Sequence, residues 1–105
     1  MKLIRMTYYV GIHEEVQDIL AEFGVTTFNR LPQVHGRISG RDPREESHVW
    51  PGTNSLVEFC VEDDRVDAVL DRVREYNRQG GDRGIDANVL DVMKCVRAEE
   101  AGASQ

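Results

Sequence analysis

The sequence has no long hydrophobic run and few basic residues. Its longest apolar runs fall far short of the roughly twenty residues that a membrane span requires, and its first residues contain no apolar signal-peptide core. We therefore expect a cytoplasmic protein without membrane insertion. The sequence contains 13 Lys and Arg residues and 19 Asp and Glu residues, which gives a formal net charge of -6. Because this negative field opposes binding to a phosphate backbone, nucleic acid is not an expected partner.

Cysteine is also scarce. Cys60 and Cys95 are the two cysteines, and they do not form a CxxC motif, which argues against a disulfide framework and a zinc motif. We expect both thiols to be buried and reduced. At 105 residues and 40% hydrophobic, the chain is long enough for one domain. We assign residues 1–96 to that domain and residues 97–105 to a flexible C-terminal tail.

Hydrophobic periodicity divides the first half into strand, helix and strand. Residues 2–10 alternate as a strand with apolar side chains on both faces. Residues 12–23 carry one apolar stripe at helical spacing, and Gly24 ends the helix. Residues 25–34 predict a weaker strand. Because Pro32 cannot donate a backbone hydrogen bond, this strand should lie at a sheet edge or contain a bulge.

The second half repeats the scheme. Residues 55–62 alternate as a strand, and Asp63 or Asp64 is placed to cap a helix whose apolar stripe spans residues 66–76. Residues 87–96 then predict the last strand. The order predicts an α+β, ferredoxin-like βαββαβ fold, with a four-stranded antiparallel sheet and two helices on one face.

The face of the sheet without helices is expected to carry exposed apolar residues. Leu3, Tyr9 and Cys60 belong to this face. Oligomerisation would cover them and would create clefts between subunits, where small ligands often bind. The alternative is a monomer with scattered surface apolar residues, which are common.

The sequence gives little support to three functions that are familiar for this fold. A metal-transfer domain needs a cysteine pair at the first strand–helix junction, and this chain has none there. An acylphosphatase needs an arginine at the same junction, but no arginine lies between Arg5 and Arg30. An RNA-recognition domain needs aromatic and basic residues on the third strand, which reads LVEFC in an acidic protein.

Residues 35–54 form a long connection between the two halves without hydrophobic periodicity. Connections of this length are typically functional or disordered. Its glycines, arginines, two histidines and Trp50 favour function, because disordered segments are poor in aromatic residues.

Residues 11–40 resemble the PII signal-transduction family. Residues 20–26 read LAEFGVT, like that family's LAE.G(I/V)T, and residues 34–37 read VHGR, like its V.G and arginine-containing turn. The resemblance continues in VEDDRV at 61–66 and VLDV at 89–92, so it covers most of the domain. It implies a homotrimer that binds a small effector, usually an adenine nucleotide such as ATP, ADP or AMP, between subunits. It further implies that the long loop controls a partner protein, such as a transporter or enzyme.

The sequence also departs from that family. Residues 35–54 contain no tyrosine, so uridylylation at the family's loop position is excluded. Residues 80–84, GGDRG, lack the two lysines of the family's phosphate loop and contain Arg83 instead. Glycine permits close backbone approach and arginine binds phosphate bidentately, although a plain helix stop is the alternative. Residues 47–55 look like a divergent PII-like branch associated with metal efflux or other transport.

The candidate site residues come from these two segments. The candidate ligand-binding residues are Gly36, Arg37, Trp50, Gly80, Gly81, Arg83 and Gly84. The candidate partner-binding residues of the loop are Arg41, Arg44 and His48. The loop arginines are alternatively surface ion pairs, and Trp50 is alternatively a lid over the core. We expect His13 to face solvent.

Three functions remain. The first is a small-ligand-sensing regulator of PII-like type. The second is a metal-responsive or metal-tolerance trimer similar to CutA, in which His35 and His48 would join in a metal site. The third is an enzyme, but the sequence offers no Ser-His-Asp arrangement, persuasive carboxylate pair or activated cysteine, so we assign no catalytic residue.

Overall fold

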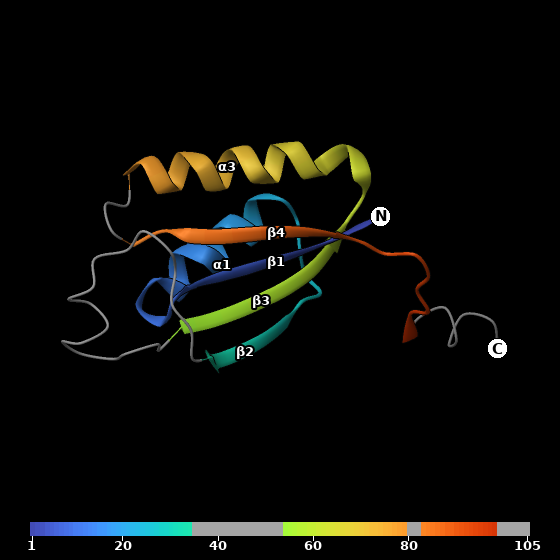
Figure 1. Cartoon of the computed structure of the whole chain (residues 1–105), viewed down its shortest axis with the longest axis horizontal. Helices are drawn as coiled ribbons and strands as arrows, with labels where there is room; N and C mark the ends of the chain where they lie inside the picture. Colours follow the sequence, from blue (N-terminus) through green and yellow to red (C-terminus); the bar gives the residue numbers. More distant parts are fainter. Residues whose placement is uncertain (35–53, 80–82, 99–105) are drawn as a thin grey trace.

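The computed structural model describes residues 1–34, 54–79 and 83–98. In these residues, an antiparallel sheet of four strands is covered on one face by two α-helices (Figure 1). The elements are β1 (Lys2–Tyr9), η1 (Val10–Ile12), α1 (His13–Glu22), β2 (Asn29–Val34), β3 (Asn54–Val61), η2 (Asp63–Arg65), α3 (Val66–Gln79) and β4 (Ile85–Asp91). The strands lie in the order β2-β3-β1-β4. The predicted ferredoxin-like fold is confirmed. The described helices include none long and apolar enough to cross a membrane.

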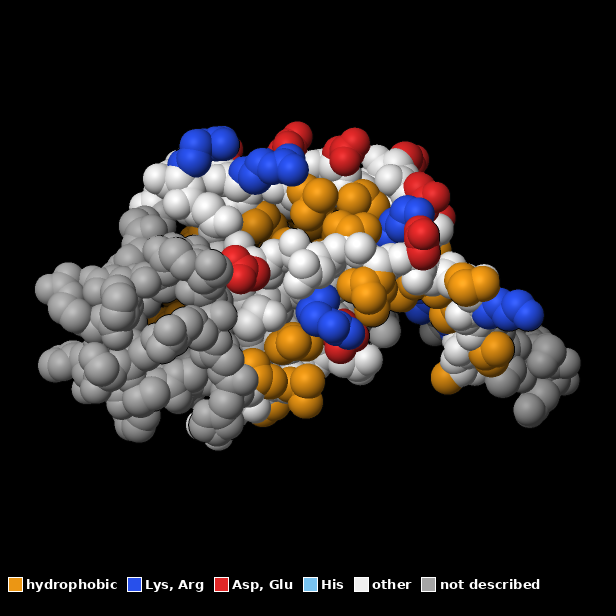
Figure 2. Space-filling view, viewed as in Figure 1, with side chains coloured by type: hydrophobic (Ala, Val, Ile, Leu, Met, Phe, Trp, Pro, Cys, Tyr) orange, Lys and Arg blue, Asp and Glu red, His pale blue; other side chains and the backbone are white. Residues whose placement is uncertain are grey.

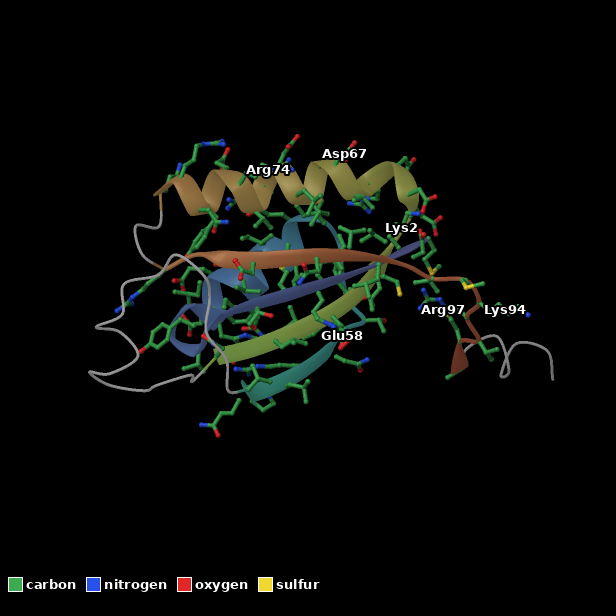
Figure 3. All side chains as sticks on the ribbon, in the orientation of Figure 1. Lys2, Glu58, Asp67, Arg74, Lys94 and Arg97 are labelled. Atoms are coloured by element: carbon green, nitrogen blue, oxygen red, sulfur yellow. The ribbon has the colours of Figure 1, made fainter. Side chains whose placement is uncertain are left out.

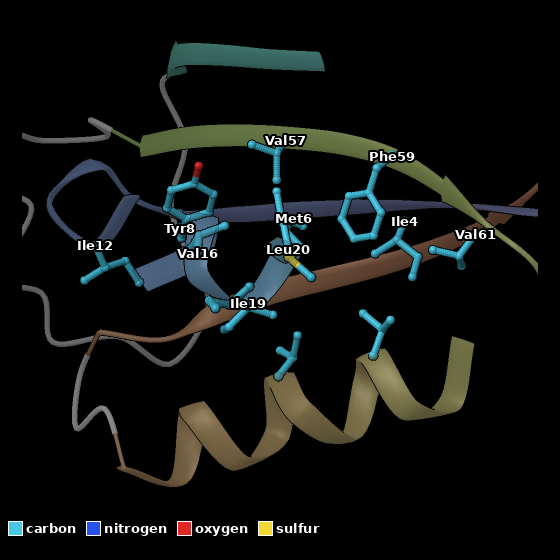
Figure 4. Close-up of a cluster of buried hydrophobic side chains, with 13 residues drawn as sticks. Ile4, Met6, Tyr8, Ile12, Val16, Ile19, Leu20, Val57, Phe59 and Val61 are labelled. Atoms are coloured by element: carbon cyan, nitrogen blue, oxygen red, sulfur yellow. The ribbon is translucent and has the colours of Figure 1, made fainter. Parts of the chain in front are cut away.

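The hydrophobic core lies between the sheet and the two helices (Figure 4). Successive side chains of a strand point to opposite faces, so alternate residues are buried from Ile4 to Tyr8 in β1 and from Ser55 to Val61 in β3. Each helix adds the apolar stripe that its sequence predicts. The buried apolar residues are Ile4, Met6, Tyr8, Ile12, Val16, Ile19, Leu20, Val57, Phe59, Val61, Val69, Val73 and Ile85.

The edge position of β2 follows from its sequence. Pro32 interrupts the hydrogen-bonding pattern, and the pairing of β2 with β3 shifts register between Leu31 and Val34. The predicted edge strand and the predicted bulge are therefore both confirmed. β2 begins at Asn29, later than the predicted residue 25. Gly24, at φ 69°, ends the helix as predicted, and the N–H of Val25 donates to the carbonyl of Leu20.

Two expectations about the second half are wrong. Asp63 and Asp64 do not cap α3, because they lie in η2, whose N-cap is Glu62 and has no side-chain cap hydrogen bond. Asp63 instead pairs with the N-terminal ammonium of Met1 at 2.6 Å. This hydrogen bond lowers the pKa of the Asp63 carboxyl.

The last strand is shorter than predicted. β4 ends at Asp91 rather than at residue 96, and the chain then leaves the body of the domain (Figure 1). Cys95 is consequently exposed and Cys60 only partly buried, so the expectation of two buried thiols is wrong.

The second face of the sheet carries apolar side chains that no described helix covers. Leu31 is 51% exposed and Leu90 is 39% exposed. Apolar side chains gather over the strands in Figure 2. Between them, a guanidinium nitrogen of Arg5 lies 3.6 Å from a carboxylate oxygen of Glu58, which is labelled in Figure 3. We call this surface the open face.

Candidate functional site

The two segments that the sequence analysis selected attach to the same end of the sheet. β2 ends at Val34 and β3 begins at Asn54, and these two residues pair with each other. Asn54 also pairs with Tyr9, the last residue of β1. The residue after the glycine-rich segment, Ile85, pairs with Tyr8. The flanks of residues 35–53 and of residues 80–84 therefore converge on what we call the anchor end.

Arg83 and Gly84 are the predicted ligand-binding residues that lie within the described parts of the chain. Arg83 is exposed, and its Cζ atom lies 5.1 Å from the centre of the Tyr9 ring, which is a cation–π distance. Gly84 is buried beside the start of β4. An exposed guanidinium at this end can still donate to an anion from its edge.

The other predicted site residues lie outside the described residues, so their positions remain predictions. They are His35, Gly36, Arg37, Arg41, Arg44, His48, Trp50, Gly80 and Gly81. Residues 1–34, 54–79 and 83–98 contain no group of three His, Cys, Asp or Glu side chains that could hold a metal ion.

A hydrogen-bonded network lies beside the anchor end, and the sequence did not predict it. The Tyr8 Oη atom lies 2.5 Å from Nδ1 of His13, and the two rings are stacked with an interplanar angle of 12°. The expectation that His13 faces solvent is therefore wrong. On the neighbouring strands, the Ser55 hydroxyl donates to the Pro32 carbonyl at 2.7 Å and accepts from Arg30 at 3.4 Å.

Burial and a nearby cation set the protonation of this network. Burial raises the pKa of the Tyr8 hydroxyl to about 12, although Arg30 acts in the opposite direction. Burial and then the Arg30 charge lower the pKa of His13 below its usual 6.5, against a smaller effect of Glu14. His13 is therefore neutral at pH 7.

A groove of about 380 Å³ lies at the opposite end of the sheet. It forms where the segment between α1 and β2 passes the end of β3 and the start of β1. The residues that line it include Leu3, Phe23, Thr26, Phe28, Glu58 and Arg97. No sequence signal points to this site, because its residues come from distant segments and form no motif.

The groove combines apolar walls with polar groups at its rim. One wall is fixed by Arg65, whose guanidinium donates to the Phe23 carbonyl at 2.9 Å and lies 5.8 Å from the Phe23 ring centre. Glu58 adds an acceptor, and Thr26 adds a hydroxyl. Such a surface offers a small molecule both apolar contact and hydrogen-bonding groups.

No protein-family model matches this sequence, and no curated protein matches it. The fold does match a solved structure, the crystal structure of "a putative PII-like signaling protein" from Thermus thermophilus. The TM-score is 0.66 with 21% sequence identity, over 94% of this chain and 92% of the other. The chain therefore has the fold of that PII-like protein.

Proposed function

We propose that this protein is a cytoplasmic, small-ligand-sensing regulator. In this proposal it binds an adenine nucleotide or another small anion in clefts between the subunits of a homotrimer. Residues 35–54 then control a partner protein, such as a transporter or enzyme, rather than taking part in catalysis. The ligand acts by favouring one conformation of this loop over another.

The observation that carries the proposal is the position of the two candidate binding surfaces. The groove includes Leu3, whereas Arg83 lies beside Tyr9 at the other end of the same strand. Tyr9 follows Leu3 by six positions along β1, about 20 Å, and follows Arg5, the partner of Glu58 in the groove, by four positions, about 13 Å. We therefore place the two surfaces of one binding site on two neighbouring copies of the chain, so that a single ligand contacts both.

The chemistry of the two surfaces is complementary for a nucleotide. The groove offers apolar walls and the Glu58 carboxylate for a base with an exocyclic amino group. The anchor end offers the Arg83 guanidinium and the flanks of a glycine-rich segment for phosphate groups. In the proposed assembly, the groove of one copy holds the base and the anchor end of its neighbour holds the phosphates.

The open face supports assembly. Leu31 and Leu90 expose apolar surface that a monomer leaves in water, and the pairing of Arg5 with Glu58 provides charges of both signs within the same surface. In the proposed assembly this face is buried between copies, and the groove of one subunit faces the anchor end of another. Three copies are proposed because the PII-like resemblance implies a trimer.

Native mass spectrometry of the full chain tests this proposal. We expect a trimer that takes up as many as three molecules of ATP, ADP or AMP. The Arg83→Ala variant should remain trimeric and lose most of this binding, whereas an Arg78→Ala variant on exposed α3 should bind like the unmodified protein.

The alternative outcomes separate the remaining functions. A monomer, or a trimer that binds none of the three nucleotides and no other small anion such as inorganic phosphate, would contradict the proposal. A trimer that binds Zn²⁺ but no nucleotide, and loses the metal in a His35→Ala, His48→Ala double variant, would favour the metal-responsive alternative.

A further inference from the structure

We propose that Tyr9 is a positioning residue whose ring holds the Arg83 side chain where it can bind the anionic part of the ligand. Gly11 allows the Tyr9 ring to adopt the position that this requires. This inference rests on the proposed function, because it concerns how the guanidinium is presented to phosphate. It goes beyond that function by assigning roles to two residues that contact no ligand themselves.

The position of the Tyr9 ring depends on the absence of a side chain at Gly11. A Cβ atom built on Gly11 would lie 2.3 Å from Cε2 of Tyr9, and 3.0 and 3.1 Å from two further ring atoms. Real Cβ atoms essentially never lie within 3.0 Å of another atom, so the 2.3 Å distance would force a shift. The ring therefore folds back over η1, directly after the strand that carries it, only because residue 11 is glycine.

The Tyr9 ring then provides the surface on which Arg83 lies. The distance of 5.1 Å from Cζ to the ring centre allows a cation–π interaction. Within residues 1–34, 54–79 and 83–98, Arg83 forms no ion pair with a carboxylate. A guanidinium that lies over a ring can still donate from the N–H groups that do not face the ring, and such groups bind phosphate.

Holding the arginine in advance should increase affinity. A free arginine side chain loses rotamer freedom when it binds a ligand, whereas one already held by a ring loses less. Exposed cation–π pairs are worth enough to change affinity about two- to fivefold. The effect should be confined to ligands that carry phosphate, because Tyr9 lies at the anchor end and not in the groove.

Four variants of the full chain separate this role from a general structural one. Tyr9→Leu removes the ring, and Tyr9→Phe keeps it. Gly11→Ala leaves the ring but displaces it, and the shift is cheap because the clash is with a side chain. Arg83→Ala removes the guanidinium. Urea unfolding first establishes that each variant folds.

Two measurements then test the proposal. In NMR spectra without ligand, the side-chain protons of Arg83 should be shifted upfield by the ring current in the unmodified protein and in Tyr9→Phe. They should move to their random-coil positions in Tyr9→Leu and Gly11→Ala. In calorimetry, ATP affinity should fall about two- to fivefold in those two variants and about tenfold or more in Arg83→Ala, while adenosine affinity stays unchanged.

Each contrary result has its own meaning. Random-coil Arg83 signals in the unmodified protein would overturn the inference whatever the ligand is. Unchanged ATP affinity in Tyr9→Leu, or an equal loss of ATP and adenosine affinity, would overturn the positioning role and leave the proposed function standing. An unmodified protein with shifted Arg83 signals that binds neither ATP, ADP or AMP nor inorganic phosphate would overturn the proposed function, and the inference with it.

Discussion

The Tyr8 hydroxyl and the His13 imidazole form a 2.5 Å hydrogen bond that joins the core side of β1 to the first residue of α1. Tyr8 is fully buried, and its pKa of about 12 keeps the hydroxyl protonated under ordinary conditions. The hydroxyl can therefore donate to Nδ1 of neutral His13. A protonated imidazole carries a hydrogen on that nitrogen and can no longer accept this bond.

Acid should destabilise the protein through His13. Its pKa in the folded state is lowered, so between that value and 6.5 the unfolded chain binds more protons than the folded chain. Stability is then retained above pH 6.5 and decreases as the pH falls through the folded-state pKa. Urea unfolding at about pH 7.5 and about pH 5.5 measures this loss.

The matched control is His13→Asn, which keeps an acceptor near the Tyr8 hydroxyl and does not titrate. The difference in stability between the two proteins should shrink or reverse at the lower pH. A difference that is the same at both pH values would contradict the assigned role of His13.

Ser55 should stabilise the bulge of β2. Its hydroxyl is fully buried and donates to the Pro32 carbonyl at 2.7 Å, where the register shift interrupts regular pairing. Ser55→Ala leaves this carbonyl without its donor and should lower the free energy of unfolding by about 1–3 kcal/mol. Urea denaturation measures the change. A Thr27→Ala substitution in an exposed segment should have a much smaller effect, and equal effects would argue against the hydrogen bond.

Gly24 should be required for its backbone conformation alone. Its φ of 69° lies in the left-handed region, while a Cβ atom at this position would meet no atom within 4 Å. Gly24→Ala should therefore cost about 1 kcal/mol of stability, through strain rather than through a clash. Gly24→Asn should cost less, because asparagine tolerates this conformation better. If both variants unfolded at the same urea concentration as the unmodified protein, the explanation would be wrong.

The open face should control assembly without controlling folding. Leu31 and Leu90 are substantially exposed in the single chain, so a Leu31→Glu, Leu90→Glu double variant should keep its helical circular dichroism. It should dissociate in sedimentation velocity experiments, because charges would be buried without partners. Ala68→Glu makes a comparable change on exposed α3 and should leave assembly intact. A double variant that assembles normally would remove the open face from the interface.

Much of the fold could be predicted because burial follows simple periods. The alternation in β1 and β3 and the stripe of α1 each place apolar residues on one face, and the structure buries those residues. Pro32 and Gly24 determine the local backbone conformation through their own covalent structure, so their effects can be predicted from residue type alone. These features need no knowledge of distant parts of the chain.

The errors arose where the outcome depends on contacts that only the folded chain makes. Asp63 has the right residue type and position for a helix cap, but the N-terminal ammonium competes for its carboxylate. His13 stands near a helix start like many exposed residues, but the fold places it against Tyr8. The groove depends on Phe23, Glu58 and Arg97, which come together only in the folded chain.

The central claim is that one ligand site is shared by two copies of the chain. Two variants disable its two halves separately. Thr26→Trp fills the groove with an aromatic side chain, and Arg83→Ala removes the guanidinium at the anchor end. Thr26→Ser serves as the control for the first substitution. Each variant alone should assemble and bind ATP poorly.

Mixing the two variants tests this claim most directly. In a mixed trimer, an intact groove from one variant would lie against an intact anchor end from the other, so native mass spectrometry should detect one ATP bound to trimers of mixed composition. Trimers of a single variant should bind much less ATP under the same conditions. Mixed trimers that bind no more ATP than the separate variants would contradict a shared site and with it the proposed mode of ligand binding.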